Sequence, residues 1–485
     1  MIISPARVRP GQIRDNGRVR RIAIIGGGPA GYEAAQVAAE LGAEVTLVEA
    51  DGVGGACVLY DCVPSKTLIA TSEKVTAFRD APAVGLEGSA SGEVAVRLAV
   101  VNERVRRLAA NQSADIARRL DKHGVRVLAG RAWFAADQPG RAFALEVSTA
   151  GQPDERIEAD AVLVATGGTP RVLPGAEPDG ERILSWRQLY DLTELPSHLI
   201  VVGSGVTGAE FASGYTELGV PVTLVSSREK VLPGEDPEAA DVIEKVFTER
   251  GGTLMKKARA ASVNRDGDEV EVRLTDGRTV RGSHVLMCVG SVPNTAGLGL
   301  ENVGLAPDAA GFLQVDRVSR TQVPGIYAAG DCTGVLLLAS VAAMQGRVAM
   351  WHALGEAVQP LRLKTVAANV FTHPEIATVG IGHAAVTSGD VPARTITLPL
   401  SGNARAKMQG ATDGFVKIYC RPASGVVIGG AVVAAQASEL IHSIAIAVQL
   451  GLTVNALAAT FTIYPSISGS VTEAARQLMH HDDLD

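Results

Sequence analysis

Two glycine-rich turns, each expected between a short aliphatic strand and a helix, constrain the fold of this chain most strongly. The first is Gly26-Gly27-Gly28-Pro29-Ala30-Gly31 after the expected strand 21–25, and the second is Gly203-Ser204-Gly205-Val206-Thr207-Gly208 after the expected strand 199–202. In such a turn the first glycine permits the tight bend, the second lets the backbone approach a pyrophosphate, and the third lets the helix pack on the strand. The helix N-terminus then offers free N–H groups and a positive dipole end to phosphates. We therefore expect nucleotide contacts from Gly26, Gly28 and Gly31 and, at a second site, from Gly203, Gly205 and Gly208.

The residue that ends the second strand of each unit differs between the two turns. In the first unit, an expected helix at about 32–41 and a strand at 45–48 lead to Glu49, whose carboxylate can accept hydrogen bonds from ribose hydroxyls. In the second unit the strand 222–225 leads to Ser226, followed two residues later by Arg228. No acid is present to repel a 2′-phosphate and Arg228 could pair with one, so the pattern favours NADPH over NADH. The alternative is that Arg228 and Lys230 belong to a solvated loop.

Length and composition agree with an α/β protein of several domains. The 485 residues exceed the size at which one hydrophobic core keeps growing. Apolar residues make up 46% of the chain and aromatic residues only 4%, so aliphatic side chains must fill the cores, as in parallel sheets covered by helices. An expected helix at 96–123 and strands near 125–128, 143–147, 161–167 and 284–289 fit this class. From about residue 363 the pattern changes to antiparallel strands and two amphipathic helices, which predicts a third folding unit.

Several classes of protein are disfavoured by the same composition. The net charge of −7 argues against a nucleic-acid-binding protein. No apolar run approaches the roughly 18 residues of a membrane span. The N-terminal segment 1–20 is rich in arginine without an apolar core, so we expect a flexible tail rather than a secretory signal, and a cytoplasmic protein. The histidines lack metal-ligand spacing, which predicts no metal site.

The order of motifs along the chain resembles the flavoprotein disulfide reductases, also called class I pyridine nucleotide-disulfide oxidoreductases. Dihydrolipoyl dehydrogenase is the most similar pattern within that family, and the resemblance covers nearly the whole chain. The matching motifs are Gly26–Gly31 with Glu49, Gly54-Gly55-Ala56-Cys57, Cys62-Val63-Pro64-Ser65-Lys66, Ala165-Thr166-Gly167, Gly203–Gly208 with Glu210, Gly290 with Pro293-Asn294-Thr295, Gly330-Asp331, Phe371-Thr372-His373-Pro374-Glu375 and Val379-Gly380.

The resemblance implies a fold of two Rossmann-like dinucleotide-binding domains, with the NAD(P) domain inserted in the FAD domain, followed by an α+β dimerisation domain. The implied boundaries are 1–20 for the tail, 21–196 and 292–362 for the FAD domain, 197–291 for the NAD(P) domain and 363–485 for the dimerisation domain. FAD would occupy the first glycine turn, and the chain would act as a homodimer. The residues that the resemblance adds to the cofactor sites are Ala132, Thr166, Gly167, Gly290, Asp331 and Ala339. Of these, Asp331 would contact the ribityl chain and Ala339 the pyrimidine edge of the flavin.

Cys57 and Cys62 lie five residues apart, on what we expect to be the first turn or two of a helix. That spacing puts both sulfurs on roughly one face, close enough for a disulfide if the local geometry permits. A helix N-terminus lowers the pKa of a thiol and so favours redox exchange. By resemblance, Cys62 would lie against the flavin and Cys57 would exchange with substrate. The alternative is a pair of small buried hydrophobic residues.

Lys66 follows Cys62 by four residues, on the same helical face. The resemblance pairs Lys66 with Glu210 beside the flavin nitrogen that accepts hydride, and a partner carboxylate would offset the cost of burying a lysine. The alternative is two separate surface charges.

The segment Thr462–Gly469 departs from the family pattern. Disulfide-reducing members carry a histidine before the proline and a glutamate five residues later, supplied by the other subunit. Here Tyr464 and Gly469 stand at those positions. A histidine titrates near neutrality and can move protons to and from thiols, whereas tyrosine, with an ordinary pKa of about 10, is a much poorer base. Tyr464 is either a proton donor to the acceptor or a residue that lines the pocket and replaces the volume of the histidine. His373 belongs to another His-Pro pair and is interpreted as structural.

Three functions remain in view. The leading hypothesis is an FAD-dependent NAD(P)H dehydrogenase that passes electrons to a quinone-type acceptor, directly or partly through the cysteine pair. The second is a disulfide reductase, including a dihydrolipoyl dehydrogenase, with a substitute base. The third is a non-catalytic flavin-binding subunit of a larger complex, which the intact second glycine turn disfavours.

Overall fold

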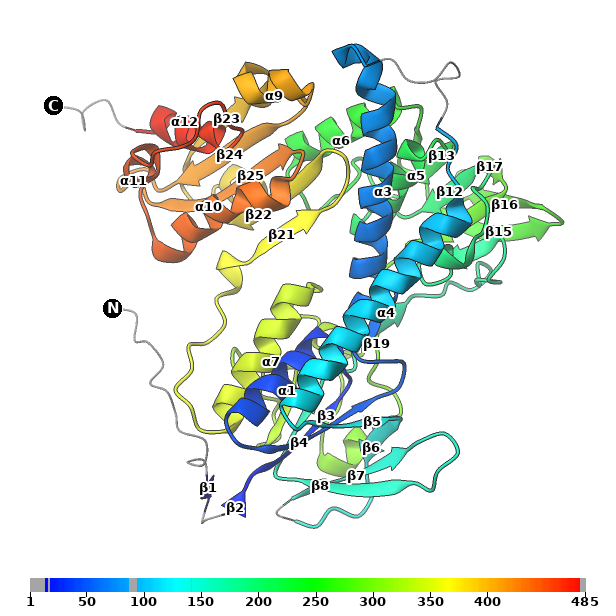
Figure 1. Ribbon diagram of the computed structural model, residues 1–485, viewed down its shortest axis with the longest axis vertical. Coiled ribbons are helices and arrows are strands. Elements are labelled where there is room, and N and C mark those ends of the chain that lie inside the picture. The colour runs from blue at the N-terminus through cyan, green and yellow to red at the C-terminus, as the bar shows by residue number, and fades with distance from the viewer. Residues whose placement is uncertain (1–13, 16–17, 87–93, 141, 480–485) are drawn as a thin grey trace. The chain divides into compact units, whose positions relative to one another are not determined.

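The computed structural model describes residues 14–15, 18–86, 94–140 and 142–479 (Figure 1). Most of the predicted N-terminal tail lies outside these residues; its described part contains β1 (Arg14–Asp15) paired antiparallel with β2 (Arg18–Val19). The chain forms two compact units: unit 1 comprises residues 1–64, 103–171 and 291–361, and unit 2 comprises residues 65–102, 172–290 and 362–485. Within the described residues, no helix combines the length and apolar character needed to cross a bilayer.

Unit 1 is built on a five-stranded parallel sheet in the order β20-β9-β3-β4-β5. Its first strand, β3, is central, and the chain crosses to β4 through α1. The chain later returns to β9 on the other side of β3, so the direction of winding reverses at the carboxyl end of β3. The bounds are β3 (Arg21–Ile25), β4 (Glu44–Glu49), β5 (Arg126–Ala129), β9 (Ala161–Val164), β20 (Ile326–Ala328) and α1 (Pro29–Glu40).

Alternation along the strands sends side chains to two different cores of unit 1. Ile22 and Ile24 pack under α1 and α7 (Ala339–Ala353), whereas Ala23 and Ile25 pack against a three-stranded antiparallel sheet. That sheet consists of β6 (Arg131–Phe134), β7 (Phe143–Ser148) and β8 (Glu155–Ala159). A short ribbon pairs β10 (Gly168–Pro170) with β19 (Ser291–Pro293). Both faces of the parallel sheet are therefore covered, as its continuous aliphatic strands require.

Unit 2 repeats the parallel architecture in the order β11-β18-β12-β13-β14. Strand β12 is again central and is followed by a helix, α5, that leads to β13. A β-meander of β15, β16 and β17 contributes Val270 and Val272 to the core on one face. The bounds are β11 (Ile183–Ser185), β12 (Leu199–Val202), α5 (Val206–Glu217), β13 (Val222–Val225), α6 (Pro237–Glu249), β14 (Thr253–Met255), β15 (Ala260–Asp266), β16 (Glu269–Leu274), β17 (Thr279–Gly282) and β18 (His284–Met287).

Unit 2 also contains a five-stranded antiparallel sheet in the order β21-β22-β25-β24-β23, which confirms the change of pattern predicted near residue 363. Its apolar face packs against α10 and α12 through residues such as Ile418, Ile444 and Val471. The bounds are β21 (Ala367–Val370), β22 (Glu375–Gly380), α8 (His383–Thr387), β23 (Arg394–Pro399), α9 (Ala404–Gln409), β24 (Phe415–Cys420), β25 (Val427–Ala434), α10 (Ala437–Leu450), α11 (Val454–Ala458) and α12 (Gly469–Gln477).

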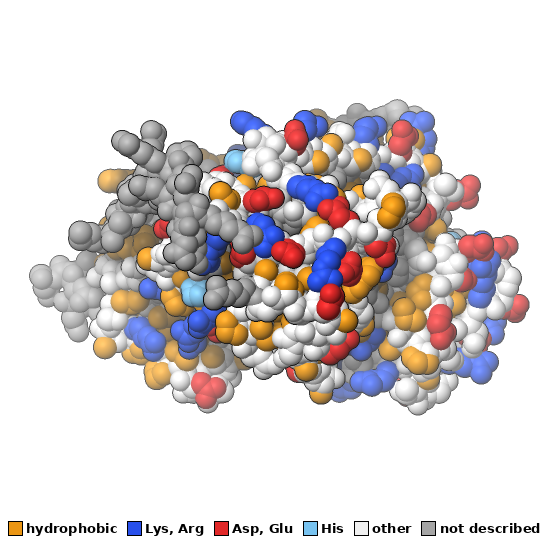
Figure 2. All heavy atoms as spheres, turned by 90° about the horizontal axis from the view of Figure 1, so that it is seen from below, with side chains coloured by type: hydrophobic (Ala, Val, Ile, Leu, Met, Phe, Trp, Pro, Cys, Tyr) orange, Lys and Arg blue, Asp and Glu red, His pale blue; other side chains and the backbone are white. Residues whose placement is uncertain are grey.

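Three further helices connect these parts along the chain: α2 (Gly55–Leu59), α3 (Cys62–Asp80) and α4 (Leu98–Lys122). The α/β class with parallel sheets is confirmed, and the finer division into four domain segments stays a prediction. On the face shown in Figure 2, Lys and Arg side chains are interspersed with Asp and Glu, which agrees with the small net charge.

Candidate functional site

The first glycine turn has the geometry of a phosphate cradle. Gly26 has φ +104°, and a Cβ there would lie 2.3 Å from the carbonyl oxygen of Ala165, at the end of the neighbouring β9. A Cβ at Gly31 would lie 1.8 Å from the carbonyl oxygen of Gly26, so only glycine lets α1 approach β3 this closely. At Gly28, in contrast, a Cβ would meet nothing within 4 Å. The N-terminus of α1 is therefore open where a pyrophosphate would lie.

Glu49 ends β4 directly beside this turn. Its Oε2 accepts a hydrogen bond from the backbone N–H of Gly27, and its Oε1 accepts one from Asp51 N–H at 2.8 Å. Both bonds fix the carboxylate at the edge of the phosphate cradle, where the hydroxyls of a nucleotide ribose would be within its reach. The turn, the helix N-terminus and the acid together fit the adenosine diphosphate half of FAD.

The second glycine turn reproduces this geometry. Gly203 has φ +110° and a Cβ there would lie 2.1 Å from the carbonyl oxygen of Cys288, at the end of β18. A Cβ at Gly208 would lie 1.8 Å from the carbonyl oxygen of Gly203, and one at Gly205 would meet nothing within 4 Å. The turn that precedes α5 thus offers the same opening to a second nucleotide.

Ser226, at the acid position of the second unit, is turned inward. Its side chain is fully buried, and its Oγ lies 2.7 Å from the Oγ of Ser204 in the glycine turn. The same Oγ accepts a hydrogen bond from Arg228 N–H at 3.1 Å. Ser226 therefore shapes the loop that carries Arg228 and leaves its hydroxyl unavailable to a ribose. Sequence reasoning identified the missing acid but not this bond between the two serines.

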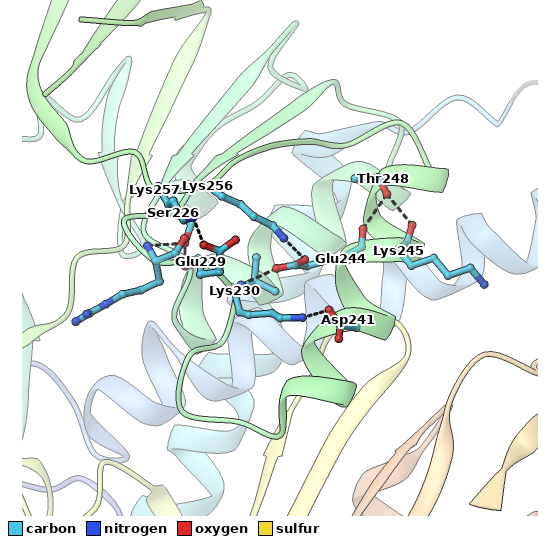
Figure 3. A network of polar contacts seen from close by, with 12 residues as sticks. Ser226, Glu229, Lys230, Asp241, Glu244, Lys245, Thr248, Lys256 and Lys257 are labelled. Atoms are coloured by element: carbon cyan, nitrogen blue, oxygen red, sulfur yellow. Dashed lines mark hydrogen bonds and ion pairs between the residues drawn. The ribbon is translucent and has the colours of Figure 1, made fainter. Parts of the chain in front are cut away.

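Several ion pairs lie near the loop that runs from Ser226 to Lys230 (Figure 3). The ammonium groups that lie nearby are matched one to one with carboxylates: Lys230 with Asp241, Lys256 with Glu244, and Lys257 with Glu229. Glu244 also accepts a hydrogen bond from Val231 N–H at 2.9 Å. Arg228 is exposed, and its guanidinium makes no ion pair with any residue that the structure describes. The loop thus presents one cation whose charge is not already matched.

The other residues expected to bind cofactor lie at several places in the two units. Thr166 and Gly167 follow β9 and are tied to Asn294, whose carbonyl oxygen accepts a bond from Thr166 Oγ1 at 2.6 Å and whose N–H donates to Gly167 O at 3.0 Å. Asp331 follows Gly330 after β20, and burial raises the pKa of its carboxyl group. Ala339 begins α7, Ala132 is buried in β6, and Gly290 has φ +94° after β18.

The cysteine pair does not lie on one continuous helix, which corrects the expectation from the sequence. Cys57 lies in α2, which ends at Leu59, and Cys62 is the first residue of α3. A turn at Tyr60 and Asp61 separates the two helices, so helical periodicity does not place the two sulfurs on one face. Both cysteine side chains are partly exposed.

Lys66 and Glu210 form the ion pair that the resemblance implied. Lys66 lies one turn after Cys62 in α3, and its Nζ is 2.7 Å from Oε2 of Glu210 in α5. The Glu210 side chain is only 4% exposed, and its Oε1 accepts a hydrogen bond from Phe371 N–H at 2.9 Å. Lys66 Nζ also lies 4.9 Å from the centre of the Phe371 ring. The two groups are therefore not separate surface charges.

Tyr464 lies on an exposed loop with two apolar neighbours. Its side chain is 88% exposed, and those of Phe461 and Ile463 are 103% and 81% exposed. Gly469 begins α12, and its N–H donates to Ser466 Oγ at 3.1 Å. The phenol of Tyr464 is therefore accessible to another molecule, such as a second copy of the chain.

One group of possible metal ligands is present among the described residues, although spacing in the sequence did not indicate it. Asp236, Glu238 and His383 bring ligand atoms within 4.8 Å of one another. However, Nζ of Lys417, which is 1% exposed, lies 2.6 Å from Asp236 and 3.2 Å from Glu238. The ammonium group already occupies the position between the carboxylates, so this group is interpreted as a buried ion pair of Lys417 with the aspartate that caps α6.

Comparisons with known proteins agree with this geometry. Residues 20–346 match the family described as pyridine nucleotide-disulphide oxidoreductase, and residues 366–475 match its dimerisation domain. An NAD(P)H dehydrogenase (quinone) of Mycobacterium tuberculosis is 60% identical over 471 residues, which cover 96% of this chain and 95% of that protein. A dihydrolipoyl dehydrogenase of Chlorobaculum tepidum is 33% identical over 94% of this chain and 96% of that protein.

The crystal structure of LpdA from Mycobacterium tuberculosis superimposes with a TM-score of 0.91 at 60% identity, and covers 95% of this chain and 100% of its own. The matches extend over both glycine turns and the antiparallel sheet. The chain therefore belongs to the pyridine nucleotide-disulphide oxidoreductase family, a family of flavin-dependent oxidoreductases.

Proposed function

We propose that this protein is an NAD(P)H dehydrogenase whose electron acceptor is a quinone. NADPH would bind at the turn Gly203–Gly208 and FAD at the turn Gly26–Gly31. FAD, when bound, supplies the group that accepts hydride from the nicotinamide and releases the electrons to the acceptor. In the net reaction NADPH and a proton reduce one quinone to the hydroquinone and leave NADP⁺.

The observation that carries the proposal is the replacement of the proton-transfer residues at Tyr464 and Gly469. Thiol–disulfide turnover needs a base that titrates near neutrality, and a tyrosine does not supply one. A quinone can instead take its protons from solvent or from the phenol of Tyr464. The 60% identical relative that is named NAD(P)H dehydrogenase (quinone) supports this acceptor.

The role proposed for the described residues is to bind, orient and balance charge. Lys66, held by Glu210, would place a positive charge beside the flavin, and Glu49 and Asp331 would hold its ribose and ribityl hydroxyls. The remaining cofactor contacts that we propose are Ala132, Thr166, Gly167, Ala339 and Gly290. The nucleotide preference for NADPH is supported by the exposed, uncompensated cation at Arg228.

We also propose a homodimer. The exposed apolar side chains at Phe461 and Ile463 support an interface at the Tyr464 loop, since fully exposed aromatic and aliphatic residues side by side mark association surfaces. The match to a dimerisation domain supports the same assembly. A cytoplasmic location, no metal and a lack of nucleic-acid partners stay predictions.

A disulfide reductase is the second candidate, because Cys57 and Cys62 are both present and dihydrolipoyl dehydrogenases are among the relatives. Three steady-state assays separate the two candidate functions. They are the oxidation of NADPH with a quinone, the oxidation of NADPH with small disulfides, and the reaction of dihydrolipoamide with NAD. We expect quinone turnover to persist in the Cys57→Ser, Cys62→Ser double variant. Robust dihydrolipoamide oxidation by the wild type would refute the leading proposal.

A further inference from the structure

Helix α5 carries a row of polar side chains that continues beyond the residue paired with Lys66. Glu210, Ser213 and Glu217 are spaced three and four residues apart, so they lie along one face of the helix. All three contact segments that are distant in the sequence. The row therefore joins α5 to two other parts of unit 2.

The first of these parts is α3, the helix that begins at Cys62. Lys66 pairs with Glu210 at one end of the contact, and two turns further on Ser72 Oγ lies 2.9 Å from Oε2 of Glu217. Between them, a Cβ on Gly214 would lie 3.7 Å from Ile69, so the two helices meet at van der Waals distance. Contacts at Glu210 and Glu217 thus fix α3 along α5 at two points rather than one.

The second part is the segment that leads from β21 to β22. Phe371 N–H donates to Glu210 at 2.9 Å, and His373 N–H donates to Ser213 Oγ at 3.1 Å. The ring nitrogen Nδ1 of His373 lies 3.7 Å from Oε1 of Glu217. The segment and α3 therefore both contact the polar face of α5, and Glu217 contacts both.

Glu217 is a buried acid whose charge is only partly compensated. Its side chain is 2% exposed, and Arg250 at the end of α6 pairs with it at 2.6 Å. Burial raises the pKa of Glu217 to about 7, because desolvation and the nearby Glu73 outweigh Arg250 and Ser72, which lower it. The carboxyl group therefore changes its charge near neutral pH.

Two further groups that can carry charge, Arg79 and His373, lie beside Glu217. Arg79 donates to the backbone carbonyl of Glu217 at 2.8 Å, so its charge is directed at the main chain. Burial and Arg250 lower the pKa of His373 to about 4, so the imidazole beside Glu217 is neutral near pH 7. A titration near neutrality at this place therefore belongs to the glutamate and not to the histidine.

Ser72 can respond to the charge of Glu217 because its hydroxyl has two acceptors and one hydrogen. Its Oγ lies 2.9 Å from Glu217 and also 2.9 Å from the carbonyl oxygen of Ile69 in its own helix. When Glu217 is ionised, the hydroxyl donates to the carboxylate in a charge-assisted bond. When Glu217 is protonated, its own O–H can donate to Ser72, whose hydrogen then turns to Ile69. The bond between the helices changes from charge-assisted to neutral.

We propose that Glu217 is a positioning residue for hydride transfer, which holds α3 along α5 through Ser72 and thereby sets Lys66 beside Glu210. The inference rests on the proposed function, since it assigns Lys66 and Glu210 to the flavin site. Ionised Glu217 gives the tighter contact and the faster reaction. Glu217 itself touches neither nucleotide nor flavin in this role.

The test is the rate of flavin reduction by excess NADPH, followed by stopped-flow absorbance from about pH 5.5 to 8.5, a range that spans a neutral ionisation. The wild-type rate is expected to rise with pH through an ionisation near neutrality. The amide of the Glu217→Gln variant can donate to Ser72 as the protonated acid does, so its rate is expected to be independent of pH and to match the acid limb of the wild type. A difference of roughly tenfold at pH 8 corresponds to the loss of one charge-assisted bond.

The matched control is Asp236→Asn, which also removes a buried ion-paired carboxylate from unit 2 but lies outside the contact between α3 and α5. It is expected to lower thermal stability and to retain the wild-type pH profile. Ser72→Ala removes the bond from the side of α3 and changes no charged group. It is expected to slow flavin reduction and to make the rate independent of the ionisation of Glu217, which itself still titrates.

The outcomes separate the inference from the function on which it rests. If the wild type is reduced while both Glu217→Gln and Ser72→Ala keep its rate and pH profile, the positioning role is wrong and the proposed function stands. The positioning role is also wrong if Asp236→Asn changes the profile as the two variants do, because the effect would then be general loss of stability. A wild-type flavin that neither nucleotide reduces overturns the proposed function and the inference together.

Discussion

At the residue scale, the two nucleotide turns differ in the side chains at the ends of β4 and β13. Glu49 is anchored beside the first turn, whereas Ser226 is buried and, of the described charges beside the second turn, Arg228 is exposed without an ion pair. Since the backbone geometry of the turns is the same, we expect the selection of nucleotide to depend on these side chains.

The Arg228→Ala variant is expected to raise the KM for NADPH by about tenfold or more, because a charge-assisted contact with the 2′-phosphate contributes about 1.5–3 kcal/mol. The KM for NADH, which lacks that phosphate, is expected to stay unchanged. Steady-state kinetics with both nucleotides measure the effect. Lys230→Ala is the control, because Lys230 is already paired with Asp241. An equal rise for both nucleotides would show that Arg228 acts on the shape of the loop.

Glu217 also makes stability depend on pH. Its pKa is raised from 4.5 to about 7 on folding, so the unfolded state releases its proton at lower pH than the folded state does. The stability linked to this group is fully present below about pH 4.5 and is lost as pH rises through about 7. Relative to Glu217→Gln, the wild type is expected to lose about 2–3 kcal/mol of unfolding free energy between pH 5 and 8. Urea unfolding across this range measures the difference, and parallel curves would contradict it.

Some of these residues could be identified from the sequence and others could not. Glu49 follows from the strand–turn–helix–strand spacing, and the pairing of Lys66 with Glu210 followed from the resemblance. The inward turn of Ser226 could not be predicted, because a serine at a strand end is as often exposed. A glutamate near the end of a helix is also typical of a surface position, and only the packing of α3 against α5 shows that Glu217 is buried.

At the element scale, glycine decides how closely a helix follows a strand. Strands β3, β12 and β13 have the bounds expected from their aliphatic runs, because the glycine turns and the following helices fix where they end. The break between α2 and α3 was missed, since neither Tyr60 nor Asp61 is a strong helix breaker. The β15–β17 meander was missed because its alternation is masked by charged residues.

Two alanine substitutions in the second turn are expected to differ in their effect on stability. In Gly208→Ala the methyl group would lie 1.8 Å from Gly203 O, so β12 and α5 must separate. We expect this variant to lose about 1–3 kcal/mol of stability and to lose NADPH binding. In Gly205→Ala the methyl group meets nothing within 4 Å, so the fold is expected to persist while NADPH binds more weakly. Thermal unfolding and nucleotide titration measure both. Equal stability of the two variants would contradict the packing argument.

At the scale of the whole molecule, the arrangement of segments was expected from the resemblance rather than from periodicity. The sequence pattern predicts three folding units, but it does not say which segments of the chain share a core. The described units each join pieces that are far apart in the sequence, such as 1–64 with 291–361. The packing of such distant segments into one unit depends on long-range contacts, which no local sequence pattern indicates.

The proposed homodimer gives a prediction at this scale. Phe461→Asp places a charge on a fully exposed aromatic position beside Tyr464, and burying that charge in an interface is costly. We expect the wild type to sediment as a dimer and the variant to dissociate into monomers at micromolar concentration. Val172→Asp, at another exposed apolar residue, is expected to remain dimeric. Identical sedimentation of all three proteins would place the interface elsewhere.

The bond between Ser204 and Ser226 bears on how this enzyme's nucleotide preference can evolve. A carboxylate that replaces Ser226 would have to point outward to reach a ribose, and the buried hydroxyl of Ser204 would then lose its partner 2.7 Å away. Replacing Ser204 first would remove the same bond but would leave the Ser226 hydroxyl its hydrogen bonds with the backbone N–H and carbonyl oxygen of Arg228. The two positions are therefore epistatic, and the order of change matters: an acid at position 226 is expected to cost less stability when Ser204 has been replaced first.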